Sequence, residues 1–575
     1  MPSPIAVERP GDYPRRYVPA DADLADWPTL EALLAELEAR PLDSPTALTR
    51  WMEDCDELYA CLGEESARRH IEMTCATSDP VAESRHLHMI NEIWPKAKPI
   101  GQRLSQKYLA CPHRRSLDRR FLFVHDRDLE TEVKLFRQAN VELEKEDAQM
   151  RQQYQKIMGA MTVVFRGEEK TLQQMAIHLE STDRAEREEA WRLVADRRLA
   201  DRQKLDELYG RMVHLRHRIA ENADYPDYVE YIFPKKLRFD YTPADCEAFH
   251  EAVETCAVPF MRRINARRKK NMGLSALRPW DLSVDELGRP PLRPFQSGRE
   301  LSEKCQEVFR NVDRDFGGTF LMMIDRGLLD LDSRKGKAPG GYQSTLSEVR
   351  LPFIFMNAAG TNNDLFTLLH EGGHAFHSMA ARDISLLSYR HAPLEFCEVA
   401  SMGMELLCCD KLEPFYDDGE AARSLRQHLE GTVMFFPWCA TIDAFQHWIY
   451  RRPEHTPEER RDAWRGLVAR FGHDVDWSGL EDARDYAWHR QSHLFTSPFY
   501  YIEYGIAQMG ALQLWVNYRH DPKQAVAQYK QALALGGGRP LPELFATAGL
   551  AFDLSKKTLE PLVAEVERAL AALPE

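Results

Sequence analysis

Apolar residues recur every three or four positions among charged residues over long stretches of this 575-residue chain. This spacing places them on one face of an α-helix, so it predicts amphipathic helices that pack around a shared core. The clearest such stretches are 30–39, 64–75, 129–157 and 172–213. Strand-like patterns are rare, and the chain is therefore expected to be mainly α-helical.

Two short segments carry strand-like patterns instead. The run 161–165 (MTVVF) precedes a turn signal, Arg166-Gly167, and predicts a small β-ribbon. The apolar and aromatic run 349–357 (VRLPFIFMN) lies between turn-rich segments and predicts a buried or half-buried strand. The length of the chain favours more than one domain, with a boundary near residue 150.

Composition and charge narrow the class of function. The chain has 44% hydrophobic and 29% charged residues, as expected of a globular protein with a large core. Its formal net charge of −15 argues against a nucleic-acid-binding protein. We find no signal peptide and no stretch with the roughly 18 apolar residues of a membrane span. The 11 cysteines are scattered and favour reduced thiols. We therefore expect a cytoplasmic protein without nucleic-acid or membrane partners.

A further helix is expected from about Asn363 to Met379. Good N-cap residues fill the segment 360–364 (GTNND), and an apolar-periodic run follows at once. The strand-like run 349–357 precedes this helix. A strand, a capped helix start and a group of chemically active residues therefore follow one another along the chain.

That group is the string HEGGH at positions 370–374. Two histidines four residues apart, His370 and His374, lie on one face of a helix about one turn apart, so both imidazoles can reach one zinc ion. Glu371 can lie beside the ion without binding it and take a proton from activated water. Two glycines inside a helix cost roughly 1 kcal/mol each relative to alanine. Gly372 and Gly373 therefore indicate that another segment packs closely there.

A catalytic zinc ion needs a third protein ligand and an open fourth position. The pattern H-E-x-x-H-x-x-G-x-x-H is excluded, because His377 and Ala380 occupy its last two defined positions. His391 is one candidate, although it lies beside Pro393 in a loop-like stretch.

A carboxylate from the next helix is the other candidate. Glu395, Glu398 and Glu405 are spaced to share one face of a helix, and their segment is otherwise apolar. Glu398 is central on that face. Its two neighbours can accept hydrogen bonds from the Nδ1–H groups of the zinc-binding histidines.

Three strings resemble the thimet oligopeptidase and oligoendopeptidase F family of mono-zinc peptidases, and they are closer to the oligoendopeptidase F-like branch. The strings are 366–377 (FTLLHEGGHAFH), 398–405 (EVASMGME) and 493–504 (HLFTSPFYYIEY). The resemblance extends over about residues 150–575 and is strongest from 335 to 515.

The resemblance implies specific roles at this site. Glu398 would be the third ligand of a single Zn²⁺ ion, and Glu371 would be the general base. His493 and a tyrosine, Tyr504 or else Tyr501, would stabilise the oxyanion. A phenol has a reference pKa near 10, so it is a protonated donor at neutral pH.

The resemblance also implies a fold and a function. It implies two helical lobes around a deep central channel, with a small β-ribbon or sheet beside the active-site helix. Residues 1–150 would be a helical cap on the channel, and 151–575 would be the catalytic domain. The run 349–357 would be the edge strand that lies alongside the substrate backbone. The implied function is that of a zinc endopeptidase that hydrolyses short, unstructured oligopeptides by means of a zinc-activated water.

Two other functions stay open. A carboxypeptidase or dipeptidyl-carboxypeptidase on a similar fold would need a cationic group for the substrate C-terminus, for which Arg334, Lys335 and Arg490 are candidates. A non-catalytic peptide-binding protein is the other possibility. The intact Glu371 argues against it, because a protein that only binds peptide needs no general base.

Overall fold

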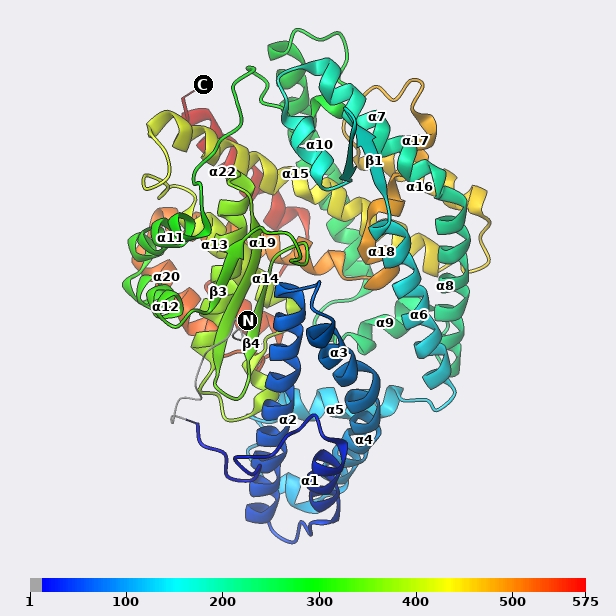
Figure 1. Cartoon of the computed structure of the whole chain (residues 1–575), viewed down its shortest axis with the longest axis vertical. Coiled ribbons are helices and arrows are strands. Elements are labelled where there is room, and N and C mark those ends of the chain that lie inside the picture. Colours follow the sequence, from blue (N-terminus) through cyan, green and yellow to red (C-terminus); the bar gives the residue numbers. More distant parts are fainter. Residues whose placement is uncertain (1–12, 575) are drawn as a thin grey trace. The chain divides into compact units, whose positions relative to one another are not determined.

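The computed structural model describes residues 13–574, and α-helices dominate it (Figure 1). The chain is 68% helical, and its described part has 22 α-helices and two small sheets of two and three strands. The predicted mainly α fold is confirmed. Within residues 13–574, no helix combines the length and apolar character that crossing a bilayer requires.

The chain forms two compact units, each assembled from three separate stretches. Unit 1 consists of Met1–Lys134, Arg293–Leu425 and Gly510–Phe552. Unit 2 consists of Leu135–Leu292, Arg426–Met509 and Asp553–Glu575. The role of residues 1–150 as a cap on a 151–575 catalytic domain stays a prediction.

Unit 1 contains most of the elements around the predicted site. Its helices are α1 Trp27–Ala39, α2 Pro45–Cys75, α3 Pro80–His88, α4 Trp94–Ala110, α5 Phe123–Leu135, α11 Gly298–Val312, α12 Arg314–Asp325, α13 Asn362–Ala381, α14 Leu394–Cys408, α20 Pro522–Leu533 and α21 Leu541–Thr547. Its strands are β3 Leu329–Asp332, β4 Tyr342–Leu346 and β5 Leu351–Ala358.

Unit 2 is helical apart from one β-ribbon. Its elements are α6 Asn140–Gly159, β1 Thr162–Phe165, β2 Glu168–Thr171, α7 Arg184–Ala200, α8 Arg202–Asn222, α9 Tyr228–Lys235, α10 Pro243–Asn271, α16 Pro457–Phe471, α17 Glu481–Asp485, α18 Ser492–Thr496 and α22 Lys556–Ala572. Two further helices, α15 Asp418–Tyr450 and α19 Tyr501–His520, contribute residues to both units.

The predicted β-ribbon is confirmed as the antiparallel pair β1–β2. Arg166 and Gly167 form its turn with φ angles of 51° and 84°, the left-handed conformation that tight hairpins require. The predicted helical stretch 129–157 is wrong as a single helix, because α5 ends at Leu135 and α6 begins at Asn140. The buried Asn140 amide donates to the Ile219 carbonyl on α8. That contact anchors the first residue of α6 on α8.

The strand predicted at 349–357 is confirmed as β5, but its predicted position at the edge of a sheet is wrong. The strand order is β3-β5-β4, with β5 parallel to β3 and antiparallel to β4. Nearly every residue of β5 is buried, as expected of a strand covered on both faces. The edge strand that follows the loop 333–341 is β4.

Helix α13 packs beside this sheet (Figure 1). It starts with a capping box, in which the Asp364 N–H donates to Thr361 Oγ1 and the Thr361 N–H donates to Asp364 Oδ2. The predicted helix start is confirmed within one residue. Such caps satisfy backbone donors that the first turn of a helix leaves unpaired.

The two glycines of α13 explain how closely its neighbours approach. A Cβ at Gly373 would lie 2.5 Å from the Ala400 carbonyl oxygen and 2.6 Å from Ser401 Cα on α14. A Cβ at Gly372 would lie 2.5 Å from the Phe309 ring on α11. The close approach predicted from these glycines is confirmed. It places α14 directly against the histidine-bearing turn of α13.

Candidate active site

Helices α13 and α14 bring together His370, His374 and Glu398, whose ligand atoms all lie within 4.8 Å of one another. The Nε2 atoms of His370 and His374 lie 3.3 and 3.7 Å from Glu398 Oε2. Donors bound to one tetrahedral zinc ion at about 2.0–2.1 Å lie about 3.3 Å apart. The three side chains therefore fit one zinc-sized cation. The histidine side chains are 23% and 19% exposed, so the group is accessible from solvent.

A second carboxylate of α14 orients this group. The His370 Nδ1 atom lies 2.7 Å from Glu405 Oε1, so the ring donates its Nδ1 proton to Glu405. Its Nε2 atom, 3.3 Å from Glu398 Oε2, is the one that a cation would take. Ser401 Oγ donates to Glu398 Oε2 over 3.0 Å. Glu405 thus occupies the position expected of a partner for a zinc-binding histidine. Glu395 is buried on the same helix, and its predicted pairing with a histidine stays a prediction.

The electrostatics of the two histidines differ. Burial alone would lower the pKa of His370, but hydrogen bonds with Glu398 and Glu405 raise it well above its ordinary value. Burial lowers the pKa of His374 to about 4. Burial would raise the pKa of Glu398, but the hydrogen bond with His370 opposes this effect and the net shift is downward. The carboxylate is therefore ionised at neutral pH, as a metal ligand must be.

Glu371 lies in the same turn of α13 and is 7% exposed. Burial raises its pKa to about 7, and a hydrogen bond from the Gln343 backbone N–H opposes that rise. Gln343 belongs to β4, so the side chain of Glu371 contacts the edge strand. A carboxylate with a pKa near neutrality can both take and release a proton.

The alternative ligand His391 and the neighbouring His377 lie outside the group. His377 is buried, its ring lies 6.0 Å from that of Phe396, and burial lowers its pKa to about 3. His391 follows a short helical turn. Its carbonyl oxygen packs against Gly537, where a Cβ atom would lie only 2.3 Å from that oxygen. The geometry therefore supports Glu398 rather than His391 as the third ligand.

The predicted oxyanion-binding residues form a cluster in unit 2. The ring of His493 on α18 lies 5.0 Å from that of Tyr501 and 5.9 Å from that of Tyr504, both on α19. The two tyrosine rings lie 5.6 Å apart, and Tyr500 also contacts His493 and Tyr504. The structure brings these residues together, and their role toward the oxyanion stays a prediction.

Two residues that the sequence analysis missed fix the orientation of His493. The Trp438 indole N–H donates to Gln491 Oε1 over 3.0 Å, and Gln491 Nε2 lies 2.7 Å from His493 Nδ1. Because indole is only a donor, the Gln491 amide must turn its NH₂ group toward His493. Burial lowers the pKa of His493, so the ring is neutral at pH 7. Its Nδ1 accepts and its proton lies on Nε2.

The turn that leads into the tyrosine helix is strained. Phe499 has a φ angle of 60°, which costs a non-glycine residue about 1 kcal/mol or more. Its N–H donates to Gln446 Oε1 over 2.6 Å, and Arg238 donates to its carbonyl oxygen. Arg238 also pairs with the buried Glu503 at 2.6 Å. This buried network holds the strained turn in place, and no local sequence pattern reveals it.

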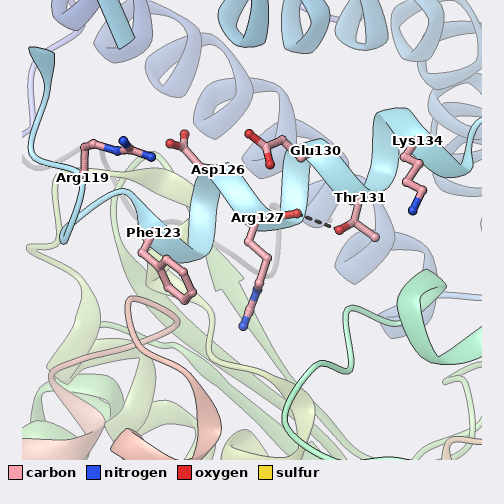
Figure 2. Close-up of a pocket in the computed structure, with 7 residues that line it drawn as sticks. All are labelled: Arg119, Phe123, Asp126, Arg127, Glu130, Thr131 and Lys134. Carbon is pink, nitrogen blue, oxygen red and sulfur yellow. Dashed lines mark hydrogen bonds between the residues drawn. The ribbon is translucent and has the colours of Figure 1, made fainter. Parts of the chain in front are cut away.

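A surface cavity lies along α5 in unit 1 (Figure 2). Its walls are formed by Arg119, Phe123, Asp126, Arg127, Glu130, Thr131 and Lys134. Figure 2 shows Asp126 and Glu130 on one side of the helix and Phe123 and Arg127 on the other. Both acids lie within 4 Å of Arg114. The cavity contains no cluster of metal ligands or nucleophiles, and we assign it no function.

Among characterised proteins, the chain is 24% identical over 338 residues to oligoendopeptidase F of a Lactococcus lactis subsp. cremoris plasmid, covering 56% of this chain and 54% of that protein. It is 26% identical over 309 residues to oligopeptidase PepF of Bacillus subtilis strain 168, covering 51% and 44%. The chain spans about half the length of the curated relatives it matches.

Similarity to solved structures extends over almost the whole chain. An oligoendopeptidase F structure is 28% identical with a TM-score of 0.87, covering 97% of this chain and 99% of that one. A structure of PZ peptidase A with an inhibitor is 27% identical, with the same TM-score and the same coverage. The model of peptidase family M3 matches residues 177–563. The expected resemblance is confirmed, and the chain belongs to peptidase family M3.

Proposed function

We propose that the chain is a zinc-dependent endopeptidase that hydrolyses short, unstructured oligopeptides. The observation that carries this proposal is the group His370, His374 and Glu398, whose donor atoms are spaced for one cation. Glu371 lies buried beside it with a pKa near 7. A peptide-binding protein without catalysis would need neither feature.

One Zn²⁺ ion would be held by His370, His374 and Glu398. When bound, it would polarise the scissile carbonyl and lower the pKa of the attacking water. Glu405 keeps the His370 ring in the tautomer that a metal ligand needs.

Glu371 acts as the general base in this proposal. Its carboxylate takes the proton of the attacking water and later delivers it to the departing amine. Its contact with the Gln343 backbone N–H keeps it at β4. Because β4 is at the edge of its sheet, the substrate backbone would lie along β4 rather than along β5.

His493 and Tyr504 are proposed to donate hydrogen bonds to the oxyanion. The hydrogen bond from Gln491 leaves the His493 proton on Nε2, so the neutral ring is a donor. Burial raises the pKa of Tyr501 to about 12, so this phenol is also protonated. It interacts with Trp438 and Gln491. Tyr504 is proposed as the donor, with Tyr501 as the alternative.

The carboxypeptidase alternative is weakened at one of its candidate cations. Arg334 donates two hydrogen bonds of 2.6 Å to Asp330 and a third to the Cys75 carbonyl. Its guanidinium is therefore already neutralised and oriented within unit 1. Burial lowers the pKa of Arg490, which stacks over Trp438.

Cleavage of an internally quenched peptide tests the proposal. We compare one peptide with a free and with an amidated C-terminus, before and after removal of metal by a chelator. We expect equal cleavage of the two peptides, loss of cleavage on chelation and recovery with Zn²⁺. Cleavage of only the free form would favour the carboxypeptidase. Full cleavage by metal-free protein would exclude a metallopeptidase.

A further inference from the structure

A second group of side chains that could hold a metal ion lies in unit 2, on the helices α10 and α15 (Figure 1). Cys246 and His250 are four residues apart on α10, and Asp443 and His447 are four residues apart on α15. Residues at this spacing share one face of a helix. Each helix therefore presents two donor groups toward the other.

The distances join these groups into one cluster. Ligand atoms of Cys246, Asp443 and His447 all lie within 4.8 Å of one another. His447 Nε2 lies 3.3 Å from Asp443 Oδ2, the same separation as that between His370 Nε2 and Glu398 Oε2 in the candidate active site. His250 Nε2 lies 2.8 Å from the same carboxylate oxygen. That shorter distance is a hydrogen bond, so His250 orients the carboxylate.

The cluster is buried, and part of its hydrogen-bonding capacity is unused. Cys246 and Asp443 are fully buried, and His447 is 5% exposed. Asp443 Oδ1 and His447 Nδ1 have no hydrogen-bond partner among residues 13–574, and the only polar contact of His447 Nε2 within this range is the one with Asp443 Oδ2. Buried polar atoms without partners destabilise a fold. These donor atoms converge beside a thiol, which is what a bound cation would require.

We propose that Cys246, Asp443 and His447 form a second cation site, which binds Zn²⁺ or a similar transition-metal ion, with His250 as the hydrogen-bond partner of Asp443. Sulfur and imidazole ligands favour zinc and its transition-metal neighbours, whereas calcium and magnesium select oxygen ligands. On binding, the Cys246 thiol loses its proton to solvent. One thiolate and one carboxylate then neutralise a divalent ion in a buried environment.

This cation site would be structural and would not contact substrate. It links α10 to α15, and the ring of His447 packs edge-on against Phe499 with centroids 5.2 Å apart. Phe499 is the strained residue of the turn before the tyrosine helix. Cys439, one turn before Asp443 on α15, donates to the Tyr501 carbonyl over 3.1 Å. A cation at the cluster would therefore brace the helix and the turn that position the tyrosines.

Cobalt substitution distinguishes this site from the candidate active site. The full-length protein is expressed in zinc-poor medium supplemented with Co²⁺, so that the ion is present while the chain folds. A thiolate bound to Co²⁺ gives a charge-transfer absorption in the near ultraviolet, which nitrogen and oxygen ligands do not give. Since the α13–α14 group contains no sulfur, this band reports only on the α10–α15 cluster.

We expect the band in the wild-type protein and its loss in Cys246→Ser. Cys256→Ser is the matched control, because Cys256 is also buried on α10 but lies outside the cluster. The double variant His370→Ala/His374→Ala should keep the band and lose about one equivalent of metal per chain. Metal content is measured on the same samples.

Absence of the band in cobalt-grown wild-type protein overturns the proposal and leaves the four side chains as a metal-free hydrogen-bonded cluster. Persistence of the band in Cys246→Ser overturns it as well. The wild-type measurement stands even where a variant fails to fold. Loss of catalysis in the double variant changes neither the cobalt band of the wild type nor its expected loss in Cys246→Ser. The test of this site is therefore independent of the proposed endopeptidase activity.

Discussion

The helix pairs α13–α14 and α10–α15 place their candidate metal ligands with a similar local geometry, but the surroundings of the two groups differ. Each pair presents two candidate ligands four residues apart on one helix to a third on the other helix, a carboxylate at α13–α14 and a thiol at α10–α15. At α13–α14 the two histidines are partly exposed, and a glutamate stands beside them. At α10–α15 all donors are buried, and a cysteine replaces one histidine. Access to solvent and a neighbouring base distinguish the proposed catalytic centre at α13–α14 from the proposed structural site at α10–α15.

The largest expected effect is on turnover, and it tests whether Glu371 at α13–α14 is a general base and not a metal ligand. Glu371→Gln should keep the metal and lower kcat by roughly 10²–10⁴-fold, because an amide cannot take a proton from water. Peptide cleavage and metal content are measured on one sample. Turnover within tenfold of the wild type would remove Glu371 from its proposed role.

The next effect tests whether the two centres are independent. Glu398→Ala should weaken zinc binding at α13–α14 by at least about 100-fold. Even mutation of a residue that only hydrogen-bonds to a metal ligand lowers metal affinity by roughly 10–100-fold. The near-ultraviolet cobalt band of the α10–α15 cluster should not change. Competition with a zinc-sensitive dye gives the affinity, and an unaltered value would exclude Glu398 as a ligand.

A smaller effect concerns the orientation of His493. Gln491→Met removes the donor to Nδ1, so the ring is no longer held with its proton on Nε2. We expect kcat to fall about tenfold with little change in KM. This is less than the loss of roughly 10²–10³-fold that follows removal of an oxyanion donor itself, because the His493 ring is still present. The ¹⁵N shifts of the imidazole should show a mixture of tautomers. A ring that keeps its proton on Nε2 would contradict the proposed role of Gln491.

The smallest effect is on stability at α10–α15. In zinc-containing buffer, Cys246→Ser should lower the Tm by roughly 2–4 °C, because a bound ion stabilises only the folded state. Cys256→Ser provides the baseline for removal of a buried thiol from α10. Equal Tm values for the two variants would indicate that Cys246 contributes packing alone.

Local signals predicted local structure well. The capping box at Thr361 and Asp364 and the apolar period after it set the start of α13, and both can be read from neighbouring residues. The uninterrupted apolar run of β5 predicted a strand, but its central place depends on β3 and β4, which no local pattern pairs with it. That run is itself typical of a strand covered on both faces, and it therefore favours a central strand over an edge strand.

The sites divide in the same way. The histidines of α13 were visible because both lie in one string, and Glu398 because it follows in the next apolar segment. Cys246 and Asp443 are almost 200 positions apart in the sequence. Their four-residue pairs with His250 and His447 are visible, but only the packing of α10 on α15 joins them. Gln491 lies two residues from His493, and its effect depends on the distant Trp438.

The contact between Gly373 and α14 has a consequence for attempts to stabilise this protein. Replacing a helical glycine with alanine normally gains about 1 kcal/mol, so Gly373 looks like an attractive engineering target. Here the added methyl group would meet the α14 backbone at 2.5 Å and force the two helices apart. Glu398 would be carried away from the histidines with every ligand still present in the chain. Standard thermostabilising design would then produce a protein that cannot bind the proposed Zn²⁺ ion.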